Sequence, residues 1–227
     1  MRKPDDIPPL SAFTPAELRL IRRLNTPAKV QRYLNGLPYN TEKHPLRDSL
    51  RGFREVIRRK TAHCLEAALF AACVLERYGH PPLVMSLMSA DMLDHVIYVY
   101  RGTNGRWGAI GRSRDPGLHG RKAAFRSPRA LALSYFDPYV DHTGSLTGYA
   151  VADLRDVEGC DWRFSRRNVW PVEKYLLRIR HRKLPRRRAR VKRLRRWYRD
   201  YRKRNGDRKP LAYRGREKWL PLPKEFL

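Results

Sequence analysis

Apolar and polar positions along this chain follow helical periods first and strand periods later. Thr14-Pro15-Ala16-Glu17 has the spacing of a capping box with proline at the first helical position, and predicts a helix to about Arg23. Thr26-Pro27 repeats the signal, and the helix that it predicts ends at Gly36. Residues 37–60 are polar and mixed, which favours a loop and a short helix near Leu50–Ile57.

Residues 62–78 form the clearest predicted helix. Almost every position between Leu65 and Leu75 is apolar, and a helix that is apolar all round lies buried at the centre of its domain. Gly79 ends this helix, and Pro81-Pro82 prevents its continuation.

Three segments rich in Val, Ile, Tyr and Trp then predict strands: Leu83–Met88, His95–Arg101 and Arg106–Ile110. The turn residues 102–105 predict that the last two strands pair as an antiparallel hairpin. Ser127-Pro128 begins a further helix that runs to about Phe136. Helices followed by consecutive strands predict an α+β fold.

The charge of the chain is concentrated near its end. The 50 Lys and Arg residues against 22 Asp and Glu give a net charge of +28, and residues 171–227 alone hold 23 basic and 5 acidic residues. This asymmetry points to a polyanionic partner, with nucleic acid ahead of an anionic membrane surface. The alternative interpretation is a solvated basic face without a ligand.

Two basic helices are expected in this region, one opened by Pro171 and one over Arg186–Arg204, with Pro185 between them. Aromatic residues on the second helix share a stripe with Val191 and Leu194, which favours packing on the domain over stacking on bases. The apolar segment Trp219–Leu227 is also expected to dock on the domain. The residues predicted to bind a polyanion are Arg186, Arg187, Arg188, Arg190, Lys192, Arg193, Arg195 and Arg196.

Composition narrows the class of protein further. Hydrophobic residues make up 41% of the chain, which is enough for a folded core. Cys64, Cys73 and Cys160 cannot form a closed set of disulfides, so we interpret them as reduced thiols of a cytoplasmic protein. No stretch approaches the roughly eighteen apolar residues of a membrane span, and an acidic Asp5-Asp6 replaces the apolar core of a signal peptide. No motif indicates a cofactor.

A cysteine and a histidine carry the candidate chemistry. Cys64 falls in the first turn of the buried helix, where unpaired amides favour a thiolate, whereas Cys73 lies mid-helix among apolar neighbours. His95 opens a strand on the same side as Ile97 and Val99, from where it could face the mouth of the helix. The alternatives are a core cysteine at position 64 and a histidine hydrogen-bonded at a strand end.

His63 has two possible placements. On the helix its side chain would project about 100° away from Cys64, whereas at the helix cap it would add positive charge next to the thiol. His63, Cys64 and His95 could together supply three ligands to a metal ion. Because no second cluster supplies a fourth ligand, we predict no metal site.

The order of these motifs resembles that of the transglutaminase-like superfamily, the circularly related cousin of papain-type cysteine peptidases, and more narrowly a group of uncharacterised bacterial proteins with this fold. The helix Val30–Leu34 followed by Leu37-Pro38-Tyr39 also resembles the helix that precedes the nucleophile there. The resemblance covers roughly residues 26–155 and implies a domain over 26–165, between an N-terminal helical segment (1–25) and a basic extension (166–227). The matching segments are Cys64-Leu65-Glu66-Ala67-Ala68, Tyr78-Gly79, His95-Val96-Ile97-Tyr98-Val99 and Trp107-Gly108-Ala109-Ile110.

The resemblance implies a thiol-dependent amide hydrolase or acyltransferase that acts on a peptide or amide substrate. Cys64 would attack the carbonyl carbon to give a thioester, with His95 as general base and then general acid. The backbone N–H of Cys64 is the natural first oxyanion donor, and Gln31 is expected as the second, with Tyr39 as the alternative.

One position departs from the superfamily's pattern. The superfamily places an aspartate four residues after the strand tryptophan, and here that position is Gly111. Ser113, or Asp115 just beyond it, is the expected replacement as the third member of a triad. The alternative function is therefore a catalytically inactive protein of the same fold that associates with nucleic acid through its basic C-terminal helices.

Overall fold

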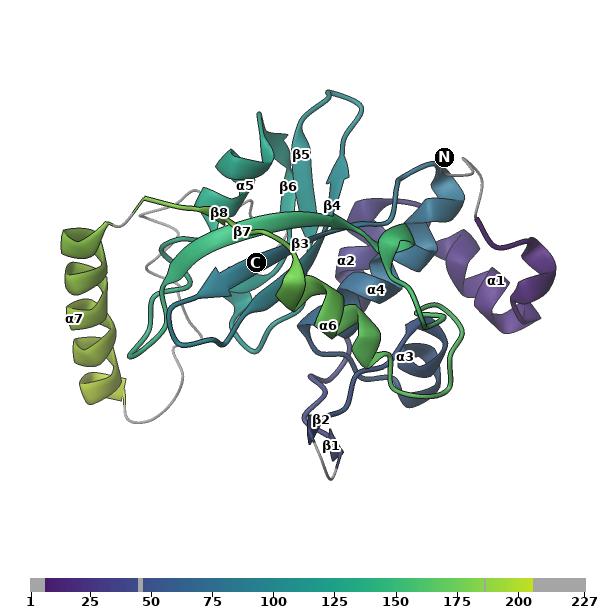
Figure 1. The fold of residues 1–227 in the computed structure, drawn as a ribbon, viewed down its shortest axis with the longest axis horizontal. Helices are drawn as coiled ribbons and strands as arrows, with labels where there is room; N and C mark the ends of the chain where they lie inside the picture. Colours follow the sequence, from purple (N-terminus) through teal and green to yellow (C-terminus); the bar gives the residue numbers. More distant parts are fainter. Residues whose placement is uncertain (1–6, 45–46, 186, 206–227) are drawn as a thin grey trace.

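A computed structural model describes residues 7–44, 47–185 and 187–205 of the chain, and its architecture is α+β (Figure 1). The central element is a six-stranded antiparallel sheet with the strand order β6-β5-β4-β3-β7-β8. The strands are β3 (Leu83–Ser89), β4 (His95–Arg101), β5 (Trp107–Ile110), β6 (Arg121–Phe125), β7 (Leu146–Asp153) and β8 (Arg182–Lys183). A separate two-stranded ribbon joins β1 (Lys43–His44) to β2 (Arg47–Asp48).

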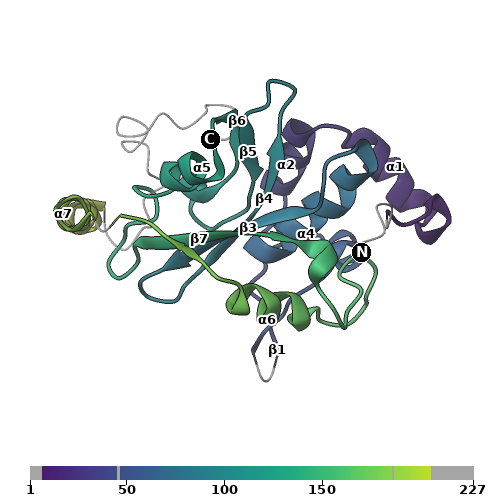
Figure 2. The ribbon, with the colours of Figure 1, turned by 45° about the horizontal axis from the view of Figure 1, so that its top comes forward.

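Seven α-helices are found in the described part of the chain. They are α1 (Pro15–Arg23), α2 (Pro27–Asn35), α3 (Phe53–Arg59), α4 (Cys64–Leu75), α5 (Pro128–Ser134), α6 (Trp170–Arg178) and α7 (Arg188–Asn205). Figures 1 and 2 place α1 and α7 at opposite ends of the molecule, with the sheet between them. No helix of the described residues combines the length and the apolar character needed to cross a membrane.

Helix α4 lies at the centre of the larger of two apolar clusters. Every residue from Leu65 to Leu75 is buried, as the sequence predicts for a helix without a polar face. Around it pack side chains of α1, α2, α3 and α6 together with Val96, Tyr98 and Tyr100 from one face of β4. Ile97 and Val99 on the other face of β4 pack in a second cluster with α5.

The predicted helices and the first three strands lie close to where the sequence places them. Thr14 forms the predicted capping box with Glu17, and Thr26 caps α2. The three predicted strands are confirmed as β3, β4 and β5, and three further strands that the sequence analysis did not identify complete the sheet. Strand β7 contains Gly148 and two alanines, residues of low strand propensity, but it pairs with β3 along its whole length. Its pairing partner, and not its own composition, makes it a strand.

We predict that Phe70→Ala lowers the free energy of unfolding by about 3–5 kcal/mol, since deleting a fully buried ring leaves a cavity. Phe70 is fully buried on α4, and its ring centroid lies 5.2 Å from that of Tyr33 and 5.4 Å from that of Phe53. Urea denaturation followed by circular dichroism measures the change. Leu177→Ala on α6 is the control, because Leu177 is 68% exposed and should cost no more than about 0.5 kcal/mol. Equal effects of the two substitutions would contradict the central role of α4.

Candidate active site

The first turn of α4 is held by a buried carboxylate. Glu66 is fully buried, and its Oε2 accepts a hydrogen bond of 2.9 Å from the backbone N–H of His63, the N-cap residue. The same carboxylate accepts hydrogen bonds from Asn40 Nδ2 at 2.9 and 3.0 Å and from the backbone N–H of Arg51 at 2.9 Å. Each bond removes part of the cost of burying the charge. The start of the helix is thereby fixed relative to two preceding loop segments.

Cys64 occupies the first helical position, and its thiol lies within hydrogen-bonding reach of two imidazoles, those of His63 and His95. The structure therefore brings together the cysteine and the strand histidine, which are far apart in the chain. His63 takes the cap placement. All three side chains line a cleft of about 630 Å³, into which the half-buried thiol opens.

The two imidazoles change the protonation of the thiol. Burial by itself raises the pKa of Cys64, but hydrogen bonds from His63 and His95, together with the positive charge of the two rings, bring its pKa well below the ordinary value. Cys73, nine residues further along the same helix, lacks such neighbours, and burial holds its pKa well above the ordinary value. Cys64 is thus placed to be a thiolate, and Cys73 is not.

His63 carries the matching positive charge. Burial by itself lowers its pKa, but the hydrogen bond to Cys64 and the charge of Glu66 raise the pKa to about 9. Its Nε2 lies 3.0 Å from the backbone oxygen of Ser49 and 3.7 Å from Glu66 Oε1. Its Nδ1 lies 3.3 Å from the N–H of Leu65, a contact that only the neutral ring can accept. In the protonated ring this nitrogen is a donor, and Cys64 is a hydrogen-bond partner of the His63 side chain.

The far side of the His95 ring is held by a backbone carbonyl. His95 is buried, and its Nε2 lies 2.9 Å from the oxygen of Leu118, in the short 3-10 helix Pro116–Leu118. Since Nε2–H donates to this oxygen, Nδ1 is the nitrogen that is left to face the thiol. The expectation that Ser113 or Asp115 takes this place is wrong: Ser113 Oγ instead accepts a hydrogen bond of 3.1 Å from the backbone N–H of Asp115.

Gly111, where the resemblance predicts an aspartate, has no room for a side chain. A Cβ atom at this position would come within 2.7 Å of Ile97 Cγ2. The backbone N–H of Gly111 donates to Gln31 Oε1 at 2.9 Å, and Gln31 Nε2 donates to Gly111 O at 2.8 Å. These two buried hydrogen bonds join α2 to the residue that follows β5.

The hydrogen bonds to Gly111 exclude Gln31 as an oxyanion donor. Its second Nε2 hydrogen is directed to Asn35 Oδ1 at 2.8 Å, so both donor hydrogens of its amide are used. The expectation for Gln31 is therefore wrong, and Tyr39 is better placed. The Tyr39 hydroxyl accepts a hydrogen bond from the backbone N–H of Cys64, and burial raises its pKa, which keeps the hydroxyl protonated.

Two groups that shape the site were not identified from the sequence. Glu66 has a readable signal, because His63 and Glu66 have the three-residue spacing of a capping box. The carbonyl of Leu118 has none, since every residue carries a carbonyl and only the tertiary fold aims this one at His95. Among the described residues, no group of three or more His, Cys, Asp and Glu side chains is arranged to hold a metal ion.

The cleft around the thiol is acidic, although the chain as a whole carries a charge of +28. Among the described residues that line it, Arg114 is the only lysine or arginine. The carboxylates that line the cleft are Glu42, Asp91, Asp94, Asp115, Asp141 and Glu173. A group that carries positive charge therefore meets a favourable potential on its way to Cys64.

The residues predicted to bind a polyanion lie on and just before α7. Two of the described ones are bonded to other parts of the protein, and the others are exposed. Arg190 forms an ion pair with the buried Asp137, and Arg195 Nη2 donates to the backbone oxygen of Thr143 at 2.5 Å. The other described members are exposed: Arg187, Arg188, Lys192, Arg193 and Arg196. Arg186 and the segment Trp219–Leu227 lie outside the described residues.

The sequence predicts that the apolar and aromatic stripe of α7 packs on the domain, and part of this stripe does. Leu194 and Tyr198 are buried, and the Tyr198 ring meets that of His142 edge to face, with 4.8 Å between centroids. Trp197 and Tyr201 contact one another at 5.6 Å between centroids.

Comparisons of the chain with models of known protein families and with curated proteins give no match. Function is therefore inferred from the geometry of the site.

We predict that the rate at which iodoacetamide alkylates Cys64 rises much less between about pH 6 and about pH 8 than that of an unperturbed thiol, because the pKa of Cys64 lies well below the ordinary value. An unperturbed thiol, with a pKa of about 8.5, would react roughly tenfold faster for each pH unit across this range. Peptide mass spectrometry after timed quenching gives the rate at each cysteine.

Cys73 is the internal control, since burial raises its pKa and it should stay unmodified. If the alkylation rate of Cys64 rises with pH as steeply as that of a free thiol, the ion pair between the Cys64 thiolate and the two imidazoles is contradicted.

Proposed function

We propose that this protein is a thiol-dependent amide hydrolase or acyltransferase with a transglutaminase-like core, in which Cys64 is the nucleophile and His95 is the acid–base group. The observation that carries the proposal is the Cys64 thiol between two imidazoles, at the first turn of a buried helix and on the floor of an open cleft. A structural cysteine needs neither the two imidazoles nor access to solvent.

The first half of the reaction forms a thioester. The thiolate sulfur of Cys64 attacks the carbonyl carbon of an amide or ester, and the π electrons of the carbonyl move onto its oxygen. We assign the Cys64 N–H and the Tyr39 hydroxyl as the two donors to that oxygen, because they lie within hydrogen-bonding distance of each other beside the thiol. The tetrahedral intermediate collapses, the bond to the leaving amine or alcohol breaks, and His95 gives that leaving group a proton.

The second half regenerates the thiolate. A water molecule or a second amine gives a proton to His95 as its oxygen or nitrogen attacks the thioester carbon, and the C–S bond then breaks. His95 keeps one orientation through both halves because Nε2 is bound to the Leu118 oxygen at 2.9 Å. His63 acts differently: its positive charge stabilises the thiolate, and its Nε2 faces Ser49 O and not the cleft.

We predict that p-nitrophenyl acetate acetylates Cys64, with release of p-nitrophenolate and an acetyl adduct on the peptide that contains this residue. Cys64→Ala should abolish the adduct, and His95→Gln should slow its hydrolysis by about 10²–10⁴-fold, as expected for a lost general base in the second half of the reaction. Absorbance and intact-protein mass spectrometry measure the two events. Cys160→Ala is the matched control, because Cys160 lies outside the cleft and should leave the rate unchanged.

The acidic lining of the cleft predicts a preference for positively charged substrates, which the same assay can measure. The p-nitrophenyl ester of N-acetylarginine should acylate Cys64 faster than that of N-acetylglutamate, because the carboxylates of the cleft attract the first and repel the second. Failure of all three esters to label Cys64 would refute the proposed function. Labelling without a charge preference would refute only the role of the acidic lining.

A second candidate function, nucleic-acid binding, is favoured by the exposed cations of α7. Arg193 and Arg196 are exposed on this helix, and phosphate contacts of this kind make affinity fall steeply with salt. We predict that a short fluorescent DNA duplex binds with an affinity that decreases as salt increases, and that Arg193→Gln together with Arg196→Gln weakens it severalfold in fluorescence anisotropy.

The pair Arg22→Gln and Arg23→Gln is the matched control, since both residues are exposed on α1 at the opposite end of the molecule (Figure 1). Equal weakening by the two pairs would indicate attraction to the net charge alone and would remove this candidate.

A further inference from the structure

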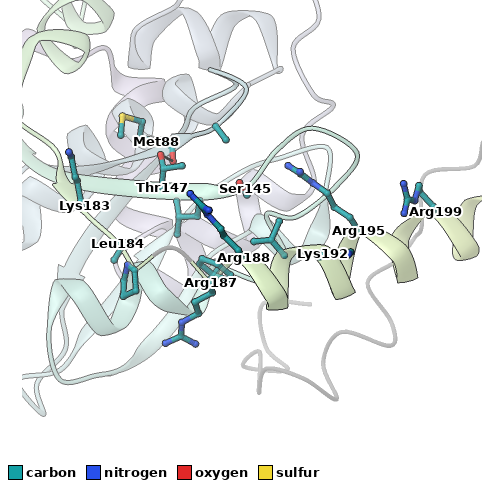
Figure 3. Close-up of a pocket in the computed structure, with 15 residues that line it drawn as sticks. Met88, Ser145, Thr147, Lys183, Leu184, Arg187, Arg188, Lys192, Arg195 and Arg199 are labelled. Atoms are coloured by element: carbon teal, nitrogen blue, oxygen red, sulfur yellow. Dashed lines mark hydrogen bonds between the residues drawn. The ribbon is translucent and has the colours of Figure 1, made fainter.

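A second cavity, of about 770 Å³, lies between α7 and the adjoining part of the sheet (Figure 3). It is separate from the cleft of Cys64, with which it shares no lining residue. Its walls come from the ends of β3 and β7 that lie nearest α7, from β8 and the residues that follow it, and from one face of α7. Its size is within the range of cavities that bind small molecules, about 300–1,000 Å³.

The base of the cavity is apolar. Leu146, Leu184 and Phe136 are buried beneath it, and Met88 and Val191 complete the surface. Phe136 is the only aromatic residue among the described lining residues, so the surface is mostly aliphatic. Such a surface suits an alkyl chain better than it suits stacked bases, which need exposed aromatic rings.

The rim of the cavity is cationic, and none of the described residues that line it carries a carboxylate. Figure 3 shows these basic side chains along α7 and the chain that leads into it. Six cations line the cavity: Lys183, Arg187, Arg188, Lys192, Arg195 and Arg199. An apolar base under a rim of one charge sign complements an anion that carries a hydrocarbon chain.

Arg195 is held in place at the wall of the cavity. Its Nη2 donates to the backbone oxygen of Thr143 at 2.5 Å, which fixes the guanidinium beside the cavity. Arg190, on the same helix, forms an ion pair with Asp137 and does not line the cavity.

We propose that this cavity binds a fatty-acid anion, with the alkyl chain on the base formed by Leu146, Leu184 and Val191 and the carboxylate at the arginine rim that includes Arg188 and Arg195. The planar guanidinium matches a carboxylate through two parallel hydrogen bonds. The site needs neither Cys64 nor His95, so it is independent of the proposed function.

Isothermal titration calorimetry of the full chain with dodecanoate, below the concentration at which it forms micelles, tests this proposal. We expect one dodecanoate per chain, and dodecanol, which lacks the charge, should bind at least about tenfold more weakly. Arg195→Gln and Lys192→Gln should each weaken dodecanoate binding, and Val191→Asp should abolish it, because a carboxylate would then lie in the apolar base. Thermal melting of each variant confirms that it is folded.

Arg193→Gln is the matched control. Arg193 is an exposed arginine of the same helix that does not line the cavity, so its loss should leave dodecanoate binding unchanged. Equal weakening by Arg193→Gln and Arg195→Gln would overturn the proposal in favour of diffuse charge attraction, as would displacement of bound dodecanoate by a short DNA duplex. Binding that is seen only after Trp219→Ala and Phe226→Ala would overturn it in favour of the chain's own C-terminal segment as the occupant.

Discussion

The buried first turn of α4 is the constraint on which the site depends. The first amides of a helix have no partners within the helix, and here the protein core surrounds the helix. The Glu66 carboxylate accepts the N–H of the cap residue His63, the Tyr39 hydroxyl accepts the N–H of Cys64, and Asn40 holds the carboxylate in place by donating to it. These hydrogen bonds fix the backbone at Cys64 and place the imidazole of His63 beside its sulfur. The low pKa of the Cys64 thiol thus follows from the packing of the helix that carries it.

A carbonyl holds His95 where an aspartate would serve in a triad, and this changes the electrostatics. The Leu118 oxygen orients the ring and selects its tautomer, but it contributes no full negative charge to an imidazolium. In this protein the negative charge next to the rings comes from the thiolate itself and, for His63, from Glu66. The ion pair is therefore shared among Cys64 and two histidines.

The uneven charge of the chain is sorted in space. Carboxylates gather around the cleft of Cys64, while cations gather around the cavity beside α7. One loop serves both: Asp141 and Gly144 line the cleft, and Ser145 lines the cavity. Arg195 binds the backbone of this loop at Thr143. A protein of high positive charge can in this way keep an acidic approach to Cys64, because electrostatic fields act over short distances in salt.

The sequence by itself determined the elements with strong local signals: the capped helices, the apolar helix around Cys73, and the strand that His95 opens, all of which depend on nearest neighbours in the chain. It also placed Cys64 at a helix start. Tertiary structure decided the rest. Strand β7 exists through its pairing with β3, and Gly111 excludes an aspartate because Ile97 packs against it. The carbonyl of Leu118 became the partner of His95 because backbone groups are alike in sequence and are distinguished only by where the chain folds.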